Sequence, residues 1–138
     1  MKKLFLDTNI ILDLLGERHP FYTEAAKIFT LADENDIELS TSSLSFATAN
    51  YILLRTIKND DVRQMLRKVK VFVQVLSLDD KIVELALNDD DFKDFEDGLQ
   101  YYTALENGQD IIITRNLKDF KYSSIPVMTA DMYLQSHL

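Results

Sequence analysis

Short apolar runs alternate with longer amphipathic stretches along the whole chain. Each short run is bounded by polar or turn-forming residues, as in buried strands, and each longer stretch repeats apolar residues at helical spacing. The pattern predicts strands at residues 3–6, 38–41, 73–77, 110–114 and 126–128. Because strands and helices alternate, we expect an α/β fold in which helices cover both faces of a parallel sheet.

The longer stretches predict helices at 21–32, 43–57, 62–71, 81–87 and 95–105. A further helix is expected to begin at Ile10, just after the first strand. An apolar stripe at helical spacing runs along the helix 43–57, formed by Leu44, Ala47, Tyr51 and Leu54. Asn107 and Gly108 are a typical stop signal for the helix 95–105.

Glycine and proline are sparse, with three and two residues in 138, and no linker, repeat or low-complexity tract divides the chain. Residues 1–138 are therefore expected to form a single domain. The absence of cysteine excludes disulfides and thiolate metal ligands. No apolar run is long enough for a signal peptide or a membrane span, so the predicted location is the cytoplasm.

Charge is divided unevenly along the chain, whose formal net charge is −8. Residues 79–97 are strongly acidic, whereas residues 55–70 are basic. Phosphate contacts need Lys or Arg, so the net charge argues against passive electrostatic binding of nucleic acid, and any nucleic acid would have to follow the basic segment. The candidates for RNA contacts are Arg55, Arg63, Arg67 and Lys68. A solvated helix face and a protein-binding surface are the alternatives for this segment.

Acidic residues at strand ends are the first candidates for chemistry, because ligands of open parallel sheets bind beyond the carboxyl ends of the strands. Asp7 directly follows the first strand, and Thr8 or Asn9 can cap the helix that comes next. Asp7 should therefore lie at the strand tip beside free backbone donors. The alternative is that Asp7 serves only as a turn or capping residue.

A second candidate segment, residues 91–97, opens the helix 95–105. The helix macrodipole favours acids in the first turn, which is sufficient to account for Asp94 and Glu96. Asp97 is different, because it lies near the expected buried stripe of this helix. That stripe is formed by Phe95, Leu99 and Tyr102. An acid in such a place needs a partner or a metal ion.

The third candidate segment, residues 114–120, follows the apolar run 111–113 at the end of a buried strand. Asn116 and Asp119 are three residues apart, so one helical turn would point both side chains the same way. The alternative for both residues is turn formation.

Four segments together resemble the PIN family in their order and spacing. They are LDTNIILD (6–13), SSLSFA (42–47), DFEDGLQY (94–101) and TRNLKDF (114–120). The resemblance covers almost the whole chain. It implies a three-layer α/β/α sandwich with parallel strand order 3-2-1-4-5. It also implies a nuclease site that binds Mg²⁺ or Mn²⁺ and hydrolyses single-stranded RNA.

The resemblance also assigns site residues by position. Asp7 matches the first acid of the family and Asp97 the third, while Asn116 or Asp119 matches the fourth. Many members carry glutamate where this chain has Thr48. The metal ligands would be Asp7, Asp97 and Asp119, and the secondary candidates are Asn9, Asp94 and Glu96. Family members often act as toxins with an antitoxin partner, and a homodimer is a further expected assembly.

The implied chemistry is hydrolysis by metal-activated water, with no covalent nucleophile. His19 and His137, in a loop and at the chain end, are not expected to act as general bases. Because of Thr48, the main alternative is a degenerate PIN-like module that binds nucleic acid or protein without cleavage. A haloacid-dehalogenase-like phosphatase would need aspartate at Asn9, and a receiver domain would need a lysine within 127–129.

Overall fold

The computed structural model describes residues 1–137 and contains a five-stranded parallel sheet in the order β3-β2-β1-β4-β5. The strands are β1 (Lys2–Leu6), β2 (Ile37–Ser42), β3 (Val73–Leu76), β4 (Ile111–Ile113) and β5 (Val127–Met128). All five strands were predicted, and their bounds agree within one residue at each end. The expected sheet order is confirmed.

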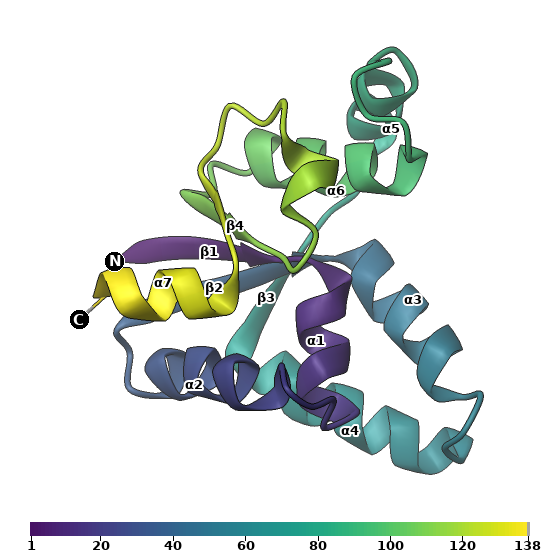
Figure 1. The fold of residues 1–138 in the computed structure, drawn as a ribbon. Helices are drawn as coiled ribbons and strands as arrows, with labels where there is room; N and C mark the ends of the chain where they lie inside the picture. The colour runs from purple at the N-terminus through teal and green to yellow at the C-terminus, as the bar shows by residue number, and fades with distance from the viewer. Residues whose placement is uncertain (138) are drawn as a thin grey trace.

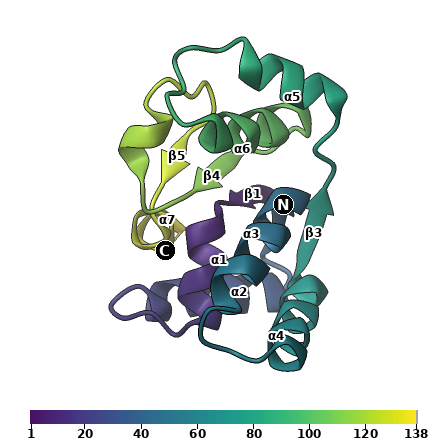
Figure 2. The same ribbon diagram turned by 90° about the vertical axis from the view of Figure 1, so that its right-hand side faces the viewer.

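Helices cover both faces of the sheet (Figures 1 and 2). They are α1 (Thr8–Leu15), α2 (Tyr22–Asp33), α3 (Ser43–Leu53), α4 (Asn59–Phe72), α5 (Asp80–Leu87), α6 (Phe95–Glu106) and α7 (Ala130–His137). In Figure 1, α5 and α6 lie above the sheet, whereas α1, α2 and α4 lie below it. A 3-10 turn, η1 (Leu117–Phe120), follows β4. No helix within residues 1–137 is long and apolar enough to cross a membrane.

Strand β1 occupies the centre of the sheet and divides the core between its two faces. Leu4 and Leu6 pack with α1, α2, α3, α4 and α7, whereas Phe5 packs with α6 and η1. All three side chains are fully buried, and their alternation follows from the two-residue period of a strand. Because β1 runs parallel to both neighbouring strands, its carboxyl end lies at the same edge of the sheet as theirs.

The starts of two helices differ from the sequence-based expectation. Helix α1 begins at Thr8 and is capped by Asp7, whose carboxylate accepts a hydrogen bond from the Thr8 backbone N–H at 2.8 Å, so neither Thr8 nor Asn9 is the cap. Helix α4 begins at Asn59, ahead of the expected start at 62. Its first turn contains Asp60 and Asp61, which suit a helix N-terminus but carry no apolar signal.

The apolar stripe expected on the helix 43–57 is wrong in both length and face. Helix α3 ends at Leu53, and Tyr51 is 66% exposed. The buried side of α3 is formed instead by Ser45, Ala49 and Leu53. Small and polar residues pack this helix closely against its neighbours, so the largest apolar side chains do not mark its inner face. Phe95 of α6 is likewise exposed rather than part of a buried stripe.

Candidate active site

Asp7 lies at the carboxyl end of β1, where its carboxylate is 6% exposed and fully engaged. One oxygen caps α1, and the other accepts hydrogen bonds from the Thr114 hydroxyl at 2.8 Å and from Asn9 Nδ2 at 3.3 Å. Burial raises the pKa of Asp7, and the charges of Glu96 and Asp119 act in the same direction. The hydrogen bonds from Thr114 and Thr8 oppose that rise in the pKa.

Asp97 lies in the first turn of α6 and is half-buried. Burial, followed by repulsion from Asp94, Asp7, Asp119 and Glu96, raises its pKa from 3.8 to about 7. These carboxylates come from β1, the start of α6 and η1, which are far apart along the chain. The fold therefore gathers the sequence-predicted acids at the carboxyl edge of the sheet, close enough for each charge to affect Asp97.

A cavity of about 280 Å³ opens beside Asp97. Asp94 and Asp119 line it with Asp97, whereas the buried Asp7 lies outside its lining. Lysines also border the cavity, namely Lys93, Lys118 and Lys121. The lining of the cavity thus combines acids and cations, an arrangement that can receive a phosphate group beside carboxylate ligands.

Asn116 and Asp119 are both exposed, but their surroundings differ. Asp119 lines the cavity, and its charge raises the pKa of both Asp7 and Asp97. Asn116 precedes η1, and its backbone N–H donates to the Thr114 hydroxyl at 3.0 Å. Its side chain makes no capping hydrogen bond to η1. This geometry favours Asp119 over Asn116 as the fourth acidic position.

The secondary candidates surround Asp7 and Asp97. Asp94 caps α6 by accepting the Glu96 N–H at 2.9 Å, which is the structural role expected for a helix start. Thr48, on α3, is partly buried, and its hydroxyl donates to Glu96 Oε1 at 3.3 Å. Thr48 therefore lies at the margin of the acidic group, and the nearest carboxylate to it comes from α6.

The donor set fits a hard divalent cation, although no group of three or more His, Cys, Asp or Glu side chains within residues 1–137 is already arranged around one point. Within the same residues, neither Asp7, Asp97, Asp119 nor Glu96 forms a salt bridge with a Lys or Arg. These four carboxylates are therefore not paired directly with a cationic side chain of the described residues. Carboxylate oxygens are the ligands that Mg²⁺ and Mn²⁺ prefer.

A buried hydrogen-bond network beneath this edge was not predicted from the sequence. Gln100 of α6 is 1% exposed, and its Nε2 donates to Ser45 Oγ at 2.7 Å and to Thr8 Oγ1 at 3.1 Å. Ser42 Oγ donates to Gln100 Oε1 at 2.6 Å. The network joins the starts of α1 and α3 to α6. Ser42 caps α3 by accepting the Ser45 N–H, but nothing in the sequence indicates that Gln100 is the partner of these serines.

Replacing Gln100 by leucine should lower the free energy of unfolding by about 1–3 kcal/mol, because three buried hydroxyls lose a partner that leucine cannot provide. Urea denaturation measures the change. Gln64→Leu is the matched control, since Gln64 is exposed on α4. Equal stability of the two variants would show that the network does not hold the three segments together.

The basic candidates lie on a different part of the surface. Arg63, Arg67 and Lys68 are exposed on α4, and Arg55 follows α3 with its guanidinium over the Tyr51 ring at 5.2 Å from the centroid. Arg63 and Arg67 line a shallow groove with Phe46 of α3. These side chains are free of salt bridges within residues 1–137 and can meet a phosphate backbone or a partner protein.

Three comparisons place this architecture among known proteins. The family profile described as PIN domain matches residues 3–118. The chain is 30% identical to Ribonuclease VapC1 of Aquifex aeolicus, over 97% of this chain and 94% of that protein.

Two solved structures share the fold. VapBC-1 from nontypeable Haemophilus influenzae has a TM-score of 0.71 at 18% identity, covering 94% of this chain and 98% of that one. A toxin–antitoxin complex from Klebsiella pneumoniae has a TM-score of 0.69 at 23% identity, covering 92% and 97%. At these identities, the likeness establishes the fold alone.

Proposed function

The chain belongs to the PIN domain family, and on this premise we propose that it is a metal-dependent ribonuclease that cleaves single-stranded RNA. The observation that carries the proposal is the group of carboxylates around Asp97, whose pKa is raised to about 7 by burial and by these neighbouring charges. The relative named Ribonuclease VapC1 supports the reaction class, because it matches this chain over almost its full length.

Asp7, Asp97 and Asp119 would hold Mg²⁺ or Mn²⁺. The bound cation would activate water and offset charge on the scissile phosphate. Other residues of the chain orient these ligands or attract the substrate. Thr114 and Asn9 fix the orientation of the Asp7 carboxylate through hydrogen bonds. The lysines that border the cavity can attract the phosphate group that is to be cleaved.

The test is cleavage of a mixture of single-stranded RNAs by the purified protein with Mn²⁺ and with EDTA. We expect cleavage only with Mn²⁺. RNA binding without cleavage under any divalent metal would contradict the nuclease and support the alternative, a degenerate binding module. The alternative is supported by Thr48, because this chain has no acid at a position where many family members carry glutamate.

We further propose that the chain is the toxin of a toxin–antitoxin pair. The two solved relatives described above are a VapBC protein and a toxin–antitoxin complex. Expression of the chain alone should arrest growth of a bacterial host, and co-expression of its cognate antitoxin should relieve the arrest. Normal growth under strong expression of an active nuclease would contradict the toxin role.

The exposed basic side chains of α4 are proposed to bind the RNA backbone. Reversing two of these charges, by Arg63→Glu with Arg67→Glu, should weaken RNA binding. It should also reduce the slope of log K against log salt by about 1.4, the value for two lost phosphate contacts on a single strand. Fluorescence anisotropy over a range of salt concentrations measures the slope. Lys2→Glu with Lys27→Glu is the charge-matched control, and equal slopes would assign α4 to another partner.

A further inference from the structure

Asp13 is a buried charge that neither the family resemblance nor the proposed reaction uses. Its side chain on α1 is 1% exposed, and both carboxylate oxygens are paired. Arg115 donates to it through Nε at 2.8 Å and through a terminal nitrogen at 3.1 Å, and Arg18 Nε donates at 3.1 Å. Burying a carboxylate is costly unless it is fully paired, and the two arginines provide that pairing.

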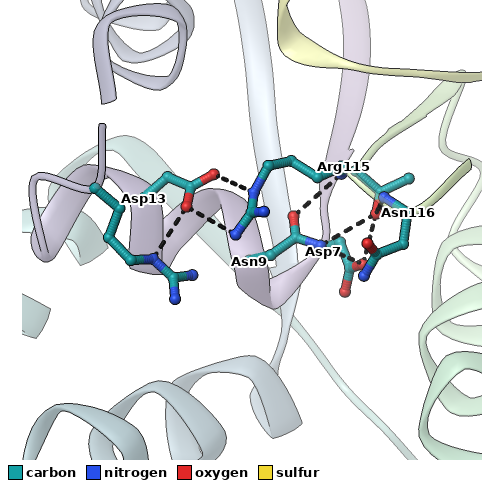
Figure 3. Close-up of polar contacts among 7 residues, drawn as sticks. Asp7, Asn9, Asp13, Arg115 and Asn116 are labelled. Atoms are coloured by element: carbon teal, nitrogen blue, oxygen red, sulfur yellow. Dashed lines mark hydrogen bonds and ion pairs between the residues drawn. The ribbon is translucent and has the colours of Figure 1, made fainter. Parts of the chain in front are cut away.

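Arg115 belongs to the turn that joins β4 to the candidate site. Its backbone N–H donates to Asn9 Oδ1 at 3.3 Å, one helical turn before Asp13 on α1. The preceding residue, Thr114, donates its hydroxyl to Asp7, and the following residue, Asn116, donates its N–H back to that hydroxyl. Figure 3 shows these contacts as one chain from Asp13 to Asp7. The Asp13 ion pair thus anchors the turn that orients the Asp7 carboxylate.

The same ion pair sets the position of the Arg115 guanidinium. Figure 3 shows the Arg115 guanidinium turned toward Asp13 and away from Asp7. The guanidinium also lies over the Phe21 ring, 4.1 Å from its centroid, on the wall of a mostly apolar cavity. Arg115 is four residues before Asp119 in the chain, so a guanidinium released from Asp13 would be free to turn toward the candidate site.

We propose that Asp13 is a positioning residue for the metal site: it holds Arg115 so that the turn 114–116 keeps Asp7 oriented, and it prevents the guanidinium from neutralising the acids. This inference rests on the proposed function. Asp13 would thus have two roles, ordering the turn 114–116 and holding the Arg115 guanidinium, although it lies outside the acidic group. A purely structural ion pair would stabilise the fold without either effect.

The first test is hydrogen exchange of the metal-free protein, observed by NMR, with Asp13→Asn. Asparagine has the same shape but no charge to hold two guanidinium groups. The amides of Arg115 and Asn116 should exchange about tenfold faster, while the Ile112 amide inside β4 stays unchanged. Equal exchange at the turn, or a uniform rise that includes Ile112, would overturn the positioning role.

The second test is Mn²⁺ calorimetry on Asp13→Asn and on the double variant Asp13→Asn with Arg115→Met. We expect about tenfold weaker binding in the single variant and recovery of most of that loss in the double variant, because the competing cation is gone. A structural role predicts the opposite, with the second substitution adding a further loss. Either that result or wild-type affinity in Asp13→Asn would overturn the inference.

Glu106→Gln is the control for both tests, since it removes one negative charge and an exposed ion pair with Lys81 at the far end of α6. It should leave the exchange of the turn and the Mn²⁺ affinity unchanged. If the wild-type protein binds no Mn²⁺, the proposed function fails instead. The exchange pattern then decides alone whether Asp13 orders the turn.

Discussion

Replacing Asp7 by asparagine is expected to abolish Mn²⁺-dependent RNA cleavage. Changes to residues that only support a metal's ligands cost up to about 100-fold, so the loss of a proposed ligand should exceed about 100-fold. Asparagine keeps the size of the side chain and an oxygen that can accept hydrogen bonds. It removes the negative charge, which a hard cation needs most. The loss should therefore appear in catalysis rather than in folding. Initial rates on a defined single-stranded RNA measure it.

The fold should survive this substitution because Asn is as good a helix cap as Asp. The Thr114 hydroxyl can also rotate to accept a hydrogen bond from the new amide. Burial raises the pKa of Asp7, so removing the charge relieves a penalty. Asp33→Asn, at the exposed end of α2, is the matched control. Cleavage by Asp7→Asn within about twofold of the control would exclude Asp7 from the reaction.

Replacing Asp97 by asparagine is expected to stabilise the metal-free protein at pH 8. The pKa of Asp97 is raised from 3.8 to about 7 by burial and by its neighbours. Such a group disfavours the folded state once it ionises. The contribution of Asp97 to stability is therefore greatest below pH 4 and is lost as the pH rises through 7. Because Asp97 is only half-buried, we expect a gain of about 1–2 kcal/mol after allowance for solvent screening.

Thermal melts between pH 4 and pH 8 test this expectation. The wild-type melting temperature should fall across that range relative to Asp97→Asn, and the variant should melt about 3–8 °C higher at pH 8. Saturating Mn²⁺ should reverse the order, since it stabilises only the protein that binds it. A lower melting temperature for Asp97→Asn without metal would mean that Asp97 stabilises the start of α6 and carries no repulsion.

The sheet and the place of Asp7 at its edge could be predicted from the sequence, because apolar runs mark buried strands and ligands bind where those strands end. Asp97 was indicated only by its place near the apolar residues of a helix start and by the family resemblance. The inner face of α3 could not, since Ser45 and Ala49 are buried by close packing and hydrogen bonds rather than by apolar area. The pairing of Gln100 with Ser42 and Ser45 was equally hidden. Contacts between segments this far apart leave no periodic signal.

Asp13 shows the same limit at the site itself. It lies inside the segment 6–13 that resembles the PIN family, yet its partner Arg115 lies over a hundred residues later. Only the β1–β4 pairing brings the two together, since Leu6 lies beside Ile113 in the sheet. Helix α7 was also missed, because the pattern of Ala130 and Tyr133 is too short to show a helical period, although Thr129 caps the helix by accepting the Met132 N–H.

The central claim is that carboxylates from β1, α6 and η1 form one divalent-metal site. Titration calorimetry with Mn²⁺ on the wild-type protein and on Asp97→Asn tests it most directly. The account predicts heat of binding from the wild type that the substitution abolishes, although the variant is folded and more stable without metal. Equal Mn²⁺ affinity in the two proteins would contradict the account.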